Sequence, residues 1–249
     1  LLTLDGIWRA CAGGEVPAAA VERMRALYRG AIAYLDAWLG RLLETLRKTD
    51  QLKNTIIIVT ADHGENLGEG GLLGHAFSLD DRLLRVPLII SGADIPAPGP
   101  LSLAALPRLL AEALDLADHP WRATDLPDRA AVAQFEPPRG ADKASLKAAG
   151  QRWGFSVDSG TLSSPIDCAS DGRFKLVRHG DRSRFFDTLV DPLERSPLVD
   201  PPAGAERLYA AIEAADARAG PQPRPAGIRD QERAEIEALE ARMRMLGYM

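Results

Sequence analysis

Asp62, His63 and His75 are the residues whose types and spacing could do chemistry. Asp62 and His63 stand together just after the apolar run TIIIVT, residues 55–60, and His75 follows twelve positions after His63 in a glycine-rich loop. A carboxylate beside an imidazole can form half of a divalent-metal site. His75 could be a further ligand or could instead contact the substrate. Either role requires the chain to turn at Gly64, because neighbouring side chains on a strand point to opposite faces.

The place of this pair in the expected sheet favours a functional role. Ligands of open parallel sheets lie beyond the carboxyl ends of the strands, which is where Asp62 and His63 fall. The pattern Asp-His-Gly is a weak signal by itself, because Asp and Gly are also common turn residues. A purely structural turn therefore stays the alternative. Glu65 and Glu69 follow in the same loop and are interpreted as solvated carboxylates without a role.

The elements that must position these residues follow from the pattern of apolar side chains. Apolar residues recur at three- and four-residue steps over about 17–48, which predicts a long amphipathic helix. The β-branched run at 55–60 predicts a strand covered on both faces, and a similar run at 86–91 predicts a second strand. Helix, strand, connection and strand in that order are typical of a βαβ-type sheet with parallel strands. The sequence therefore predicts an α/β fold.

Shorter elements are expected beyond residue 92. Segment 101–116 has the composition of a helix. The expected later elements are strands at 131–136, 152–157, 173–180 and 184–189, with the last two in a hairpin, and helices at 204–218 and 229–246 around a proline-rich linker at 220–227. We therefore expect two parts, an α/β part at 1–120 and a smaller part at 121–249 with an antiparallel sheet and terminal helices.

Composition excludes several classes of protein. The chain has 249 residues, of which 46% are hydrophobic, and a formal net charge of −5 without long runs of Lys or Arg, so an extended nucleic-acid footprint is not expected. No apolar stretch approaches the length of a membrane span. Cys11 and Cys168 fit no zinc or disulfide pattern and are interpreted as partly buried thiols. His119 and His179 are expected to be exposed turn residues.

The stretch around the Asp-His pair resembles a known family. NTIIIVTADHGENLGEGG, followed by GH and then LLRVPLIISG, is similar in order and spacing to the C-terminal half of the sulfatase family, in the alkaline phosphatase superfamily. LYRGAIAYLDAWLGRLLETLRKTDQLKNT is similar to the helix that leads into that family's metal strand. DGRFKLVRHGDRSRFFDTLVDPLE resembles its small antiparallel sheet, and EIEALEARMRMLGYM resembles its C-terminal tail. The resemblance implies an alkaline-phosphatase-like mixed sheet flanked by helices, with a small α+β subdomain.

The resemblance also implies roles for the three residues. Asp62 and His63 would be metal ligands, and His75 would contact the oxyanion that is transferred. The ion would be Ca²⁺ by analogy with the family, whereas an Asp and His pair also suits Mn²⁺ or Zn²⁺. The implied activity is hydrolysis of sulfate esters, acting on a small anionic ester. The alternatives are a phosphonate or phosphate-ester hydrolase, a phosphoethanolamine-type transferase, and a noncatalytic relative that binds an anion or a partner.

The family's nucleophile motif, C/S-x-P-x-R, does not occur in this chain. Cys11 lies in CAGG and Cys168 in CASD, so neither matches it. The chain is therefore expected to be about the C-terminal half of an enzyme and inactive alone, with any formylglycine in the missing N-terminal part. Such a chain should expose an apolar strand edge and helix face. A periplasmic or secreted location is what the resemblance suggests.

Overall fold

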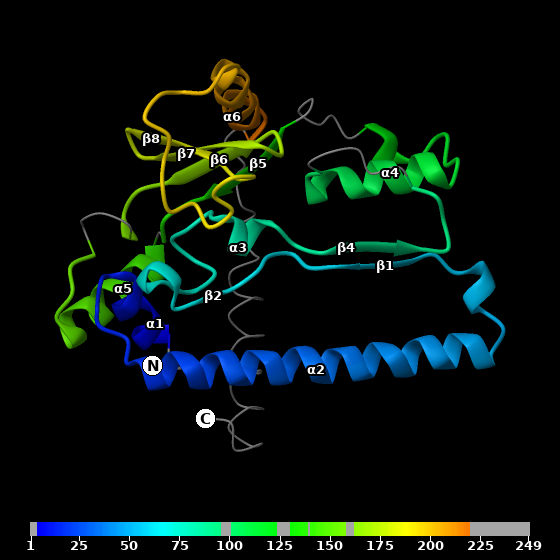
Figure 1. Ribbon diagram of the computed structural model, residues 1–249, viewed down its shortest axis with the longest axis horizontal. Helices are drawn as coiled ribbons and strands as arrows, with labels where there is room; N and C mark the ends of the chain where they lie inside the picture. Colours follow the sequence, from blue (N-terminus) through cyan, green and yellow to red (C-terminus); the bar gives the residue numbers. More distant parts are fainter. Residues whose placement is uncertain (1–3, 96–100, 124–129, 139, 158–161, 220–249) are drawn as a thin grey trace. The chain divides into compact units, whose positions relative to one another are not determined.

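The computed structural model describes residues 4–95, 101–123, 130–138, 140–157 and 162–219 (Figure 1). The chain divides into two compact units, residues 1–214 and 215–249. The elements that position the candidate site lie in the first unit. The expected helix at 229–246 and the linker at 220–227 lie outside the described residues. Within the described residues, no helix combines the length and the apolar character needed to cross a membrane.

The long helix expected near the N-terminus is present as α2 (Ala18–Lys48). Its first turns are fixed to the loop that follows the first strand, because Arg25 makes an ion pair of 2.9 Å with Glu69 and Val21 packs against Gly68. None of its residues is buried.

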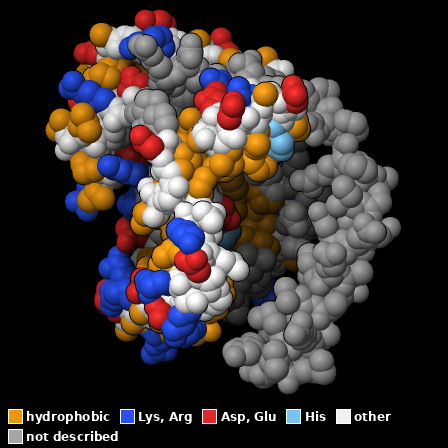
Figure 2. All heavy atoms as spheres, turned by 90° about the vertical axis from the view of Figure 1, so that its right-hand side faces the viewer, with side chains coloured by type: hydrophobic (Ala, Val, Ile, Leu, Met, Phe, Trp, Pro, Cys, Tyr) orange, Lys and Arg blue, Asp and Glu red, His pale blue; other side chains and the backbone are white. Residues whose placement is uncertain are grey.

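The exposed side chains of α2 include large apolar ones. Leu35 is 64% exposed and Trp38 is 49% exposed, and Ile89 on the second strand of the first sheet is 59% exposed. Figure 2 shows one face of the molecule on which hydrophobic side chains reach the surface. The expectation of an exposed apolar helix face is therefore confirmed.

The two strands of the first sheet pair in the opposite sense to the one expected. β1 (Ile57–Thr60) and β4 (Leu88–Ser91) are antiparallel, with Ile57 opposite Ser91 and Thr60 opposite Leu88. A parallel return needs a long crossover, usually a helix. The chain between them is used instead for a small hairpin and the single-turn helix α3 (Asp81–Leu84). The mixed α/β class is confirmed, and the prediction that these two strands are parallel is wrong.

The small hairpin follows the Asp-His pair directly. β2 (Asn66–Leu67) pairs antiparallel with β3 (Leu73–Gly74), and the turn between them contains the 3-10 helix η2 (Glu69–Gly71). Gly68 has a φ of 101°, a left-handed conformation that favours glycine. The glycine-rich composition of this loop therefore serves a tight return of the chain.

The second sheet has four antiparallel strands in chain order. These are β5 (Ala131–Phe135), β6 (Ile166–Ser170), β7 (Phe174–His179) and β8 (Arg182–Asp187). The expected hairpin of the last two strands is confirmed. The strand expected at 152–157 is wrong, because helix α5 (Gly140–Trp153) occupies its start and Gly154, with a φ of 72°, ends that helix.

The second sheet packs on both faces. On one face, Leu176 and Phe185 pack against the first half of α6 (Ala205–Ala219), through Leu208 and Ile212. On the other face, Ile166, Cys168, Val177 and Phe186 form a cluster with Leu79, which precedes α3. The segment that follows the candidate site is therefore packed directly on this sheet.

The remaining described elements are short helices. They are α1 (Leu4–Cys11), η1 (Leu52–Asn54), η3 (Leu103–Ala105), α4 (Leu106–Ala113) and η4 (Pro120–Ala123). The helix α4 lies inside the expected helical segment 101–116. The helix α1 adds Trp8 and Cys11 to a third apolar cluster with Phe77 and Leu146.

Candidate active site

The turn after β1 sets the orientation of the Asp-His pair. Asp62 Oδ1 accepts a hydrogen bond from the backbone N–H of His63 at 2.9 Å. His63 Nδ1 lies 2.8 Å from the carbonyl oxygen of Gly64. A carbonyl oxygen only accepts, so Nδ1 carries the proton and Nε2 is turned away from this bond. Asp62 Oδ2 lies 3.6 Å from that Nε2.

Gly64 is required by a close approach of the backbone rather than by a positive φ. Its N–H donates to the carbonyl oxygen of Leu83 at 2.7 Å. A Cβ at this position would lie 1.9 Å from the carbonyl oxygen of Arg82, which is shorter than any real contact. The turn that carries His63 is therefore held directly against α3.

The register of the small hairpin brings His75 back to the turn. Asn66 pairs with Gly74, so Glu65 and His75 are the next residues in line on the two strands. Glu65 Oε2 lies 3.3 Å from His75 Nδ1. The eleven residues between His63 and His75 form a loop that the hairpin closes.

The imidazole of His75 stacks on that of His63. Their ring centroids are 4.2 Å apart and their planes are inclined by 30°. The potential ligand atoms of His63, Glu65 and His75 all lie within 4.8 Å of one another. Asp62 stands beside this cluster with 88% of its side chain exposed, whereas Glu65 is 29% exposed.

The structure therefore brings His63 and His75 together, and it places Asp62 against His63. It also brings in Glu65, for which the sequence predicts only a solvated carboxylate without a role. The signal that could have identified Glu65 is its position opposite His75, which becomes visible only when the glycine-rich stretch is interpreted as a hairpin.

Asp80 caps α3, the helix against which Gly64 rests. Its Oδ1 accepts hydrogen bonds from the backbone N–H of Arg82 at 3.1 Å and from Arg82 Nε at 2.9 Å, and Ser78 Oγ donates to its other oxygen. Burial alone would raise the pKa of the Asp80 carboxyl, but the hydrogen bonds from Arg82 and Ser78 lower that pKa below its ordinary value. The carboxylate therefore stays charged and holds the first turn of α3.

A buried ion cluster ties α3 to the second sheet. Lys175 on β7 is fully buried, and its Nζ lies 2.7 Å from Asp81 Oδ1 and 2.7 Å from Glu194 Oε1. The backbone N–H of Asp81 also donates to Glu194 Oε1, at 2.7 Å. Burial would lower the pKa of Lys175, but the charges of Glu194 and Asp81 raise it above its ordinary value. Lys175 is therefore a cation at neutral pH.

The two cysteines are buried and free. Burial raises the pKa of the Cys168 thiol to about 11 and also raises that of Cys11. A thiol acts as a nucleophile in its thiolate form, which these pKa values disfavour at neutral pH. Both residues were expected to be partly buried thiols, and the structure shows them buried.

These features define a mixed α/β protein with two histidines and two carboxylates gathered where a strand ends. Residues 9–119 match the family model described as Sulfatase, so this part of the chain is recognised as belonging to the sulfatase family. It is 32% identical over 196 residues to the choline-sulfatase of Rhizobium meliloti (strain 1021), an alignment that covers 74% of this chain and 35% of that protein.

Two further relatives agree with this family. The chain is 40% identical over 81 residues to the multifunctional alkaline phosphatase superfamily protein PehA of Trinickia caryophylli, covering 32% of this chain and 16% of that protein. A solved structure of a putative sulfatase from Bacteroides thetaiotaomicron VPI-5482 superposes with a TM-score of 0.58 at 16% identity, over 86% of this chain and 48% of that one. This superposition shows the likeness of fold. The chain spans less than half of the length of each of these relatives.

Proposed function

We propose that this chain belongs to a metal-dependent hydrolase of sulfate esters that acts on a small anionic ester. Asp62 and His63 would be metal ligands, and His75 would contact the oxyanion of the substrate. The observation that carries the proposal is the stacking of His75 on His63 at the end of β1, with ring centroids 4.2 Å apart, inside the segment that matches the sulfatase family.

The donor atoms suit a divalent cation. Asp62 Oδ2 and His63 Nε2 lie 3.6 Å apart, a separation that two ligands of one ion can have after a small adjustment. Ca²⁺ is the ion proposed from the family, and it takes about six to eight oxygen ligands. Mn²⁺ and Zn²⁺ accept imidazole nitrogen more readily. When bound, a divalent cation polarises the ester oxygens and stabilises the negative charge of the transition state.

Glu65 would orient His75 in this arrangement. Its Oε2 can accept a hydrogen bond from His75 Nδ1 at 3.3 Å, and Nε2 of the same ring can donate to an ester oxygen when both ring nitrogens carry protons. From that nitrogen His75 could donate a hydrogen bond to the oxyanion or protonate the leaving oxygen. His75 is 58% exposed, so a substrate can reach it.

A second arrangement is favoured by the closeness of three donors. His63, Glu65 and His75 have their ligand atoms within 4.8 Å of one another, so all three could bind one ion. Two imidazoles and one carboxylate are a ligand set of transition metals. In this arrangement His75 would no longer be free to contact a substrate.

A calorimetric titration of the 249-residue chain with Ca²⁺, Mn²⁺ and Zn²⁺ tests the metal site. In the proposed arrangement Asp62→Ala and His63→Ala remove binding, whereas Glu65→Gln leaves it within about threefold, because the amide can still accept from His75. In the arrangement with three donors, Glu65→Gln weakens binding at least about tenfold and Asp62→Ala does not. Glu44→Gln, an exposed carboxylate of α2, is the matched control. No binding of any of the three ions would contradict the metal site.

The alternative activity is that of a phosphonate or phosphate-ester hydrolase of the same superfamily, and PehA is named a multifunctional protein of the alkaline phosphatase superfamily. Parallel assays of the whole protein with 4-nitrophenyl sulfate, 4-nitrophenyl phosphate and 4-nitrophenyl phenylphosphonate separate these reactions. A higher kcat/KM for the sulfate supports the proposal, and a higher value for either phosphorus ester supports the alternative. A whole protein that binds metal and turns over none of them would support the noncatalytic, anion-binding alternative.

A further inference from the structure

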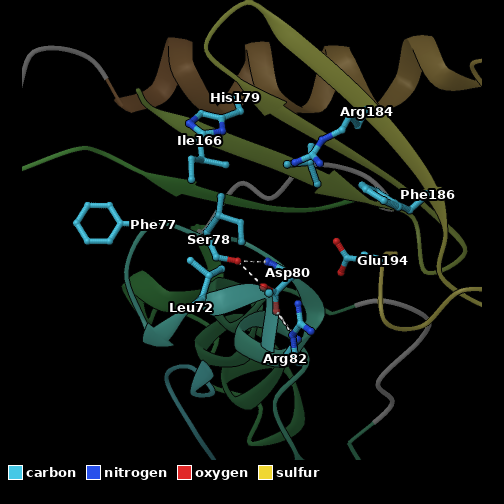
Figure 3. A pocket seen from close by; sticks show the side chains of 13 residues that line it. Leu72, Phe77, Ser78, Asp80, Arg82, Ile166, His179, Arg184, Phe186 and Glu194 are labelled. Carbon is cyan, nitrogen blue, oxygen red and sulfur yellow. Dashed lines mark hydrogen bonds and ion pairs between the residues drawn. The ribbon is translucent and has the colours of Figure 1, made fainter. Parts of the chain in front are cut away.

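A cavity of about 310 Å³ lies between the second sheet and the segment from Gly70 to Arg82 (Figure 3). Its volume is at the lower end of the range of small-molecule sites, about 300–1,000 Å³. Both walls have apolar side chains, which are Leu72, Phe77 and Leu79 from the segment and Ile166, Val177 and Phe186 from the sheet. None of Asp62, His63, Glu65 and His75 lines the cavity.

The register of the sheet places two nitrogen groups at this cavity. His179 and Val177 lie on the same face of β7, because side chains alternate along a strand, and Val177 is paired with Arg184 on β8. His179 is paired with Ile166 on its other side. Figure 3 shows the His179 ring and the Arg184 side chain beside the apolar wall.

His179 has a polar atom without an explanation in the fold. Its Nε2 is buried and has no hydrogen-bond partner. Burial lowers the pKa of His179 below its ordinary value, and the charges of Arg184 and Arg182 lower it further. The ring is therefore neutral at pH 7, and its Nε2 can donate if its proton is on that atom. Buried polar atoms generally have a partner, and Nε2 is closed off from solvent, so a ligand atom can bond to it once the ring turns towards the cavity.

The charged groups around the cavity indicate the sign of the ligand. Asp80 is engaged by Ser78 and Arg82, and Glu194 is engaged by Lys175. Arg184 by contrast makes no ion pair within the described residues, and its guanidinium lies 5.8 Å from the centre of the Phe186 ring. Among the described residues, the polar groups at the cavity without an ion pair or hydrogen bond are thus the guanidinium of Arg184 and Nε2 of His179, both of which can donate to an oxyanion.

We propose that this cavity binds a small monoanion with an aromatic or branched apolar body. The oxyanion lies between Arg184 and His179 Nε2, and the apolar body packs against Phe77, Ile166 and Phe186. This site lies apart from the candidate metal ligands and does not depend on the proposed hydrolase activity. A charge paired with arginine and an apolar body in a preformed pocket together give both affinity and orientation.

Benzoate is a suitable probe, and the binding can be followed by NMR of the His179 ring in the 249-residue chain with EDTA present. EDTA removes any contribution from a metal. We expect saturable shifts of the His179 ring signals with benzoate. Much smaller shifts are expected with benzyl alcohol, which lacks the charge, with benzylamine, which reverses it, and with acetate, which lacks the apolar body. Preferential binding of benzylamine over benzoate would overturn the proposal. The proposal would also be overturned if benzoate failed to saturate the shifts at about 50-fold molar excess over millimolar protein, a concentration that would detect even weak binding.

Two neighbouring arginines supply a matched pair of variants. Arg184→Gln should weaken benzoate binding at least about tenfold, because a hydrogen-bonded charge is lost. Arg182→Gln removes the same charge two residues away, from a side chain that does not line the cavity, and should change binding less than about twofold. Equal weakening by both variants would mean unspecific electrostatic attraction and would overturn the site. His179→Gln keeps a donor but not the ring, so its binding is followed by calorimetric titration with benzoate, and it should weaken binding less than Arg184→Gln does in the same titration.

Discussion

Lys175 Nζ lies 2.7 Å from Asp81 Oδ1, although the two residues are 94 positions apart in the sequence. Asp81 begins α3, and the same helix turn accepts the hydrogen bond of Gly64 through the carbonyl oxygen of Leu83. The ion pair therefore connects the second sheet to the turn that carries His63. The second sheet therefore contributes to the geometry of the candidate site without placing a side chain in it.

Replacement of Lys175 should destabilise the whole unit. Lys175→Met leaves the partly buried carboxylates of Asp81 and Glu194 close together without their cation. We expect the free energy of unfolding to fall by about 3–5 kcal/mol, the usual cost of removing one partner of a buried ion pair. Urea denaturation measures this change. Lys143→Met, an exposed position on α5, should change it by less than about 0.5 kcal/mol, and equal effects would contradict the role of the cluster.

The Asp80 cap predicts a pH dependence. The pKa of Asp80 is lowered in the folded chain, so its contribution is complete above the ordinary aspartate pKa of 3.8 and is lost as the pH falls through the lower folded value. Asp80→Asn keeps a capping side chain but removes the charge. We expect a loss of about 1–2 kcal/mol at pH 7 that shrinks towards pH 2. Urea denaturation at both pH values measures it, and a loss that does not depend on pH would contradict the assignment.

Gly64 should not tolerate a side chain. Gly64→Ala places a Cβ 1.9 Å from the carbonyl oxygen of Arg82, so the backbone must move. We expect a loss of about 1–3 kcal/mol in the free energy of unfolding, together with weaker metal binding. Gly30→Ala is the matched control, because a Cβ there meets nothing and alanine favours the interior of α2 by up to about 1 kcal/mol. If both variants were stabilising, the turn would not be held as described.

The thiols should be protected in the folded chain. Cys11 and Cys168 are buried, with pKa values above the ordinary one. We expect Ellman's reagent at pH 8 to label neither thiol quickly in the native chain and to label both after unfolding in urea. Rapid labelling of native Cys168 would contradict its burial and would reopen a role as a reactive thiol.

The local elements of the fold could be predicted well from the sequence. The spacing of apolar residues identified α2, and the turn GDRS identified the hairpin of β7 and β8. The antiparallel pairing of β1 with β4 could not be predicted, because the sequence of an apolar strand does not indicate its orientation. The orientation depends on whether the connecting segment forms a long crossover or a local turn. The strand β6 was missed because IDCAS has few β-branched residues, and its position is set by pairing with both neighbours.

The candidate site was predicted in part. The types and positions of Asp62, His63 and His75 marked a possible site, and the structure places the two histidine rings in contact. Glu65 was not recognised, because its importance comes from the hairpin register. The cluster of Lys175 with Asp81 and Glu194 could not be found either, since it joins residues far apart in the sequence. His179, expected to be an exposed turn residue, instead ends β7 with a buried Nε2.

The metal site is tested most directly by paramagnetic broadening with Mn²⁺. The chain has only four histidines, so the ring signal of each one can be followed separately. Substoichiometric Mn²⁺ should broaden the ring signals of His63 and His75 in NMR spectra of the 249-residue chain much more strongly than those of His119 and His179. Asp62→Ala should remove the effect. Equal broadening of all four rings, or none, would contradict a metal site at the end of β1.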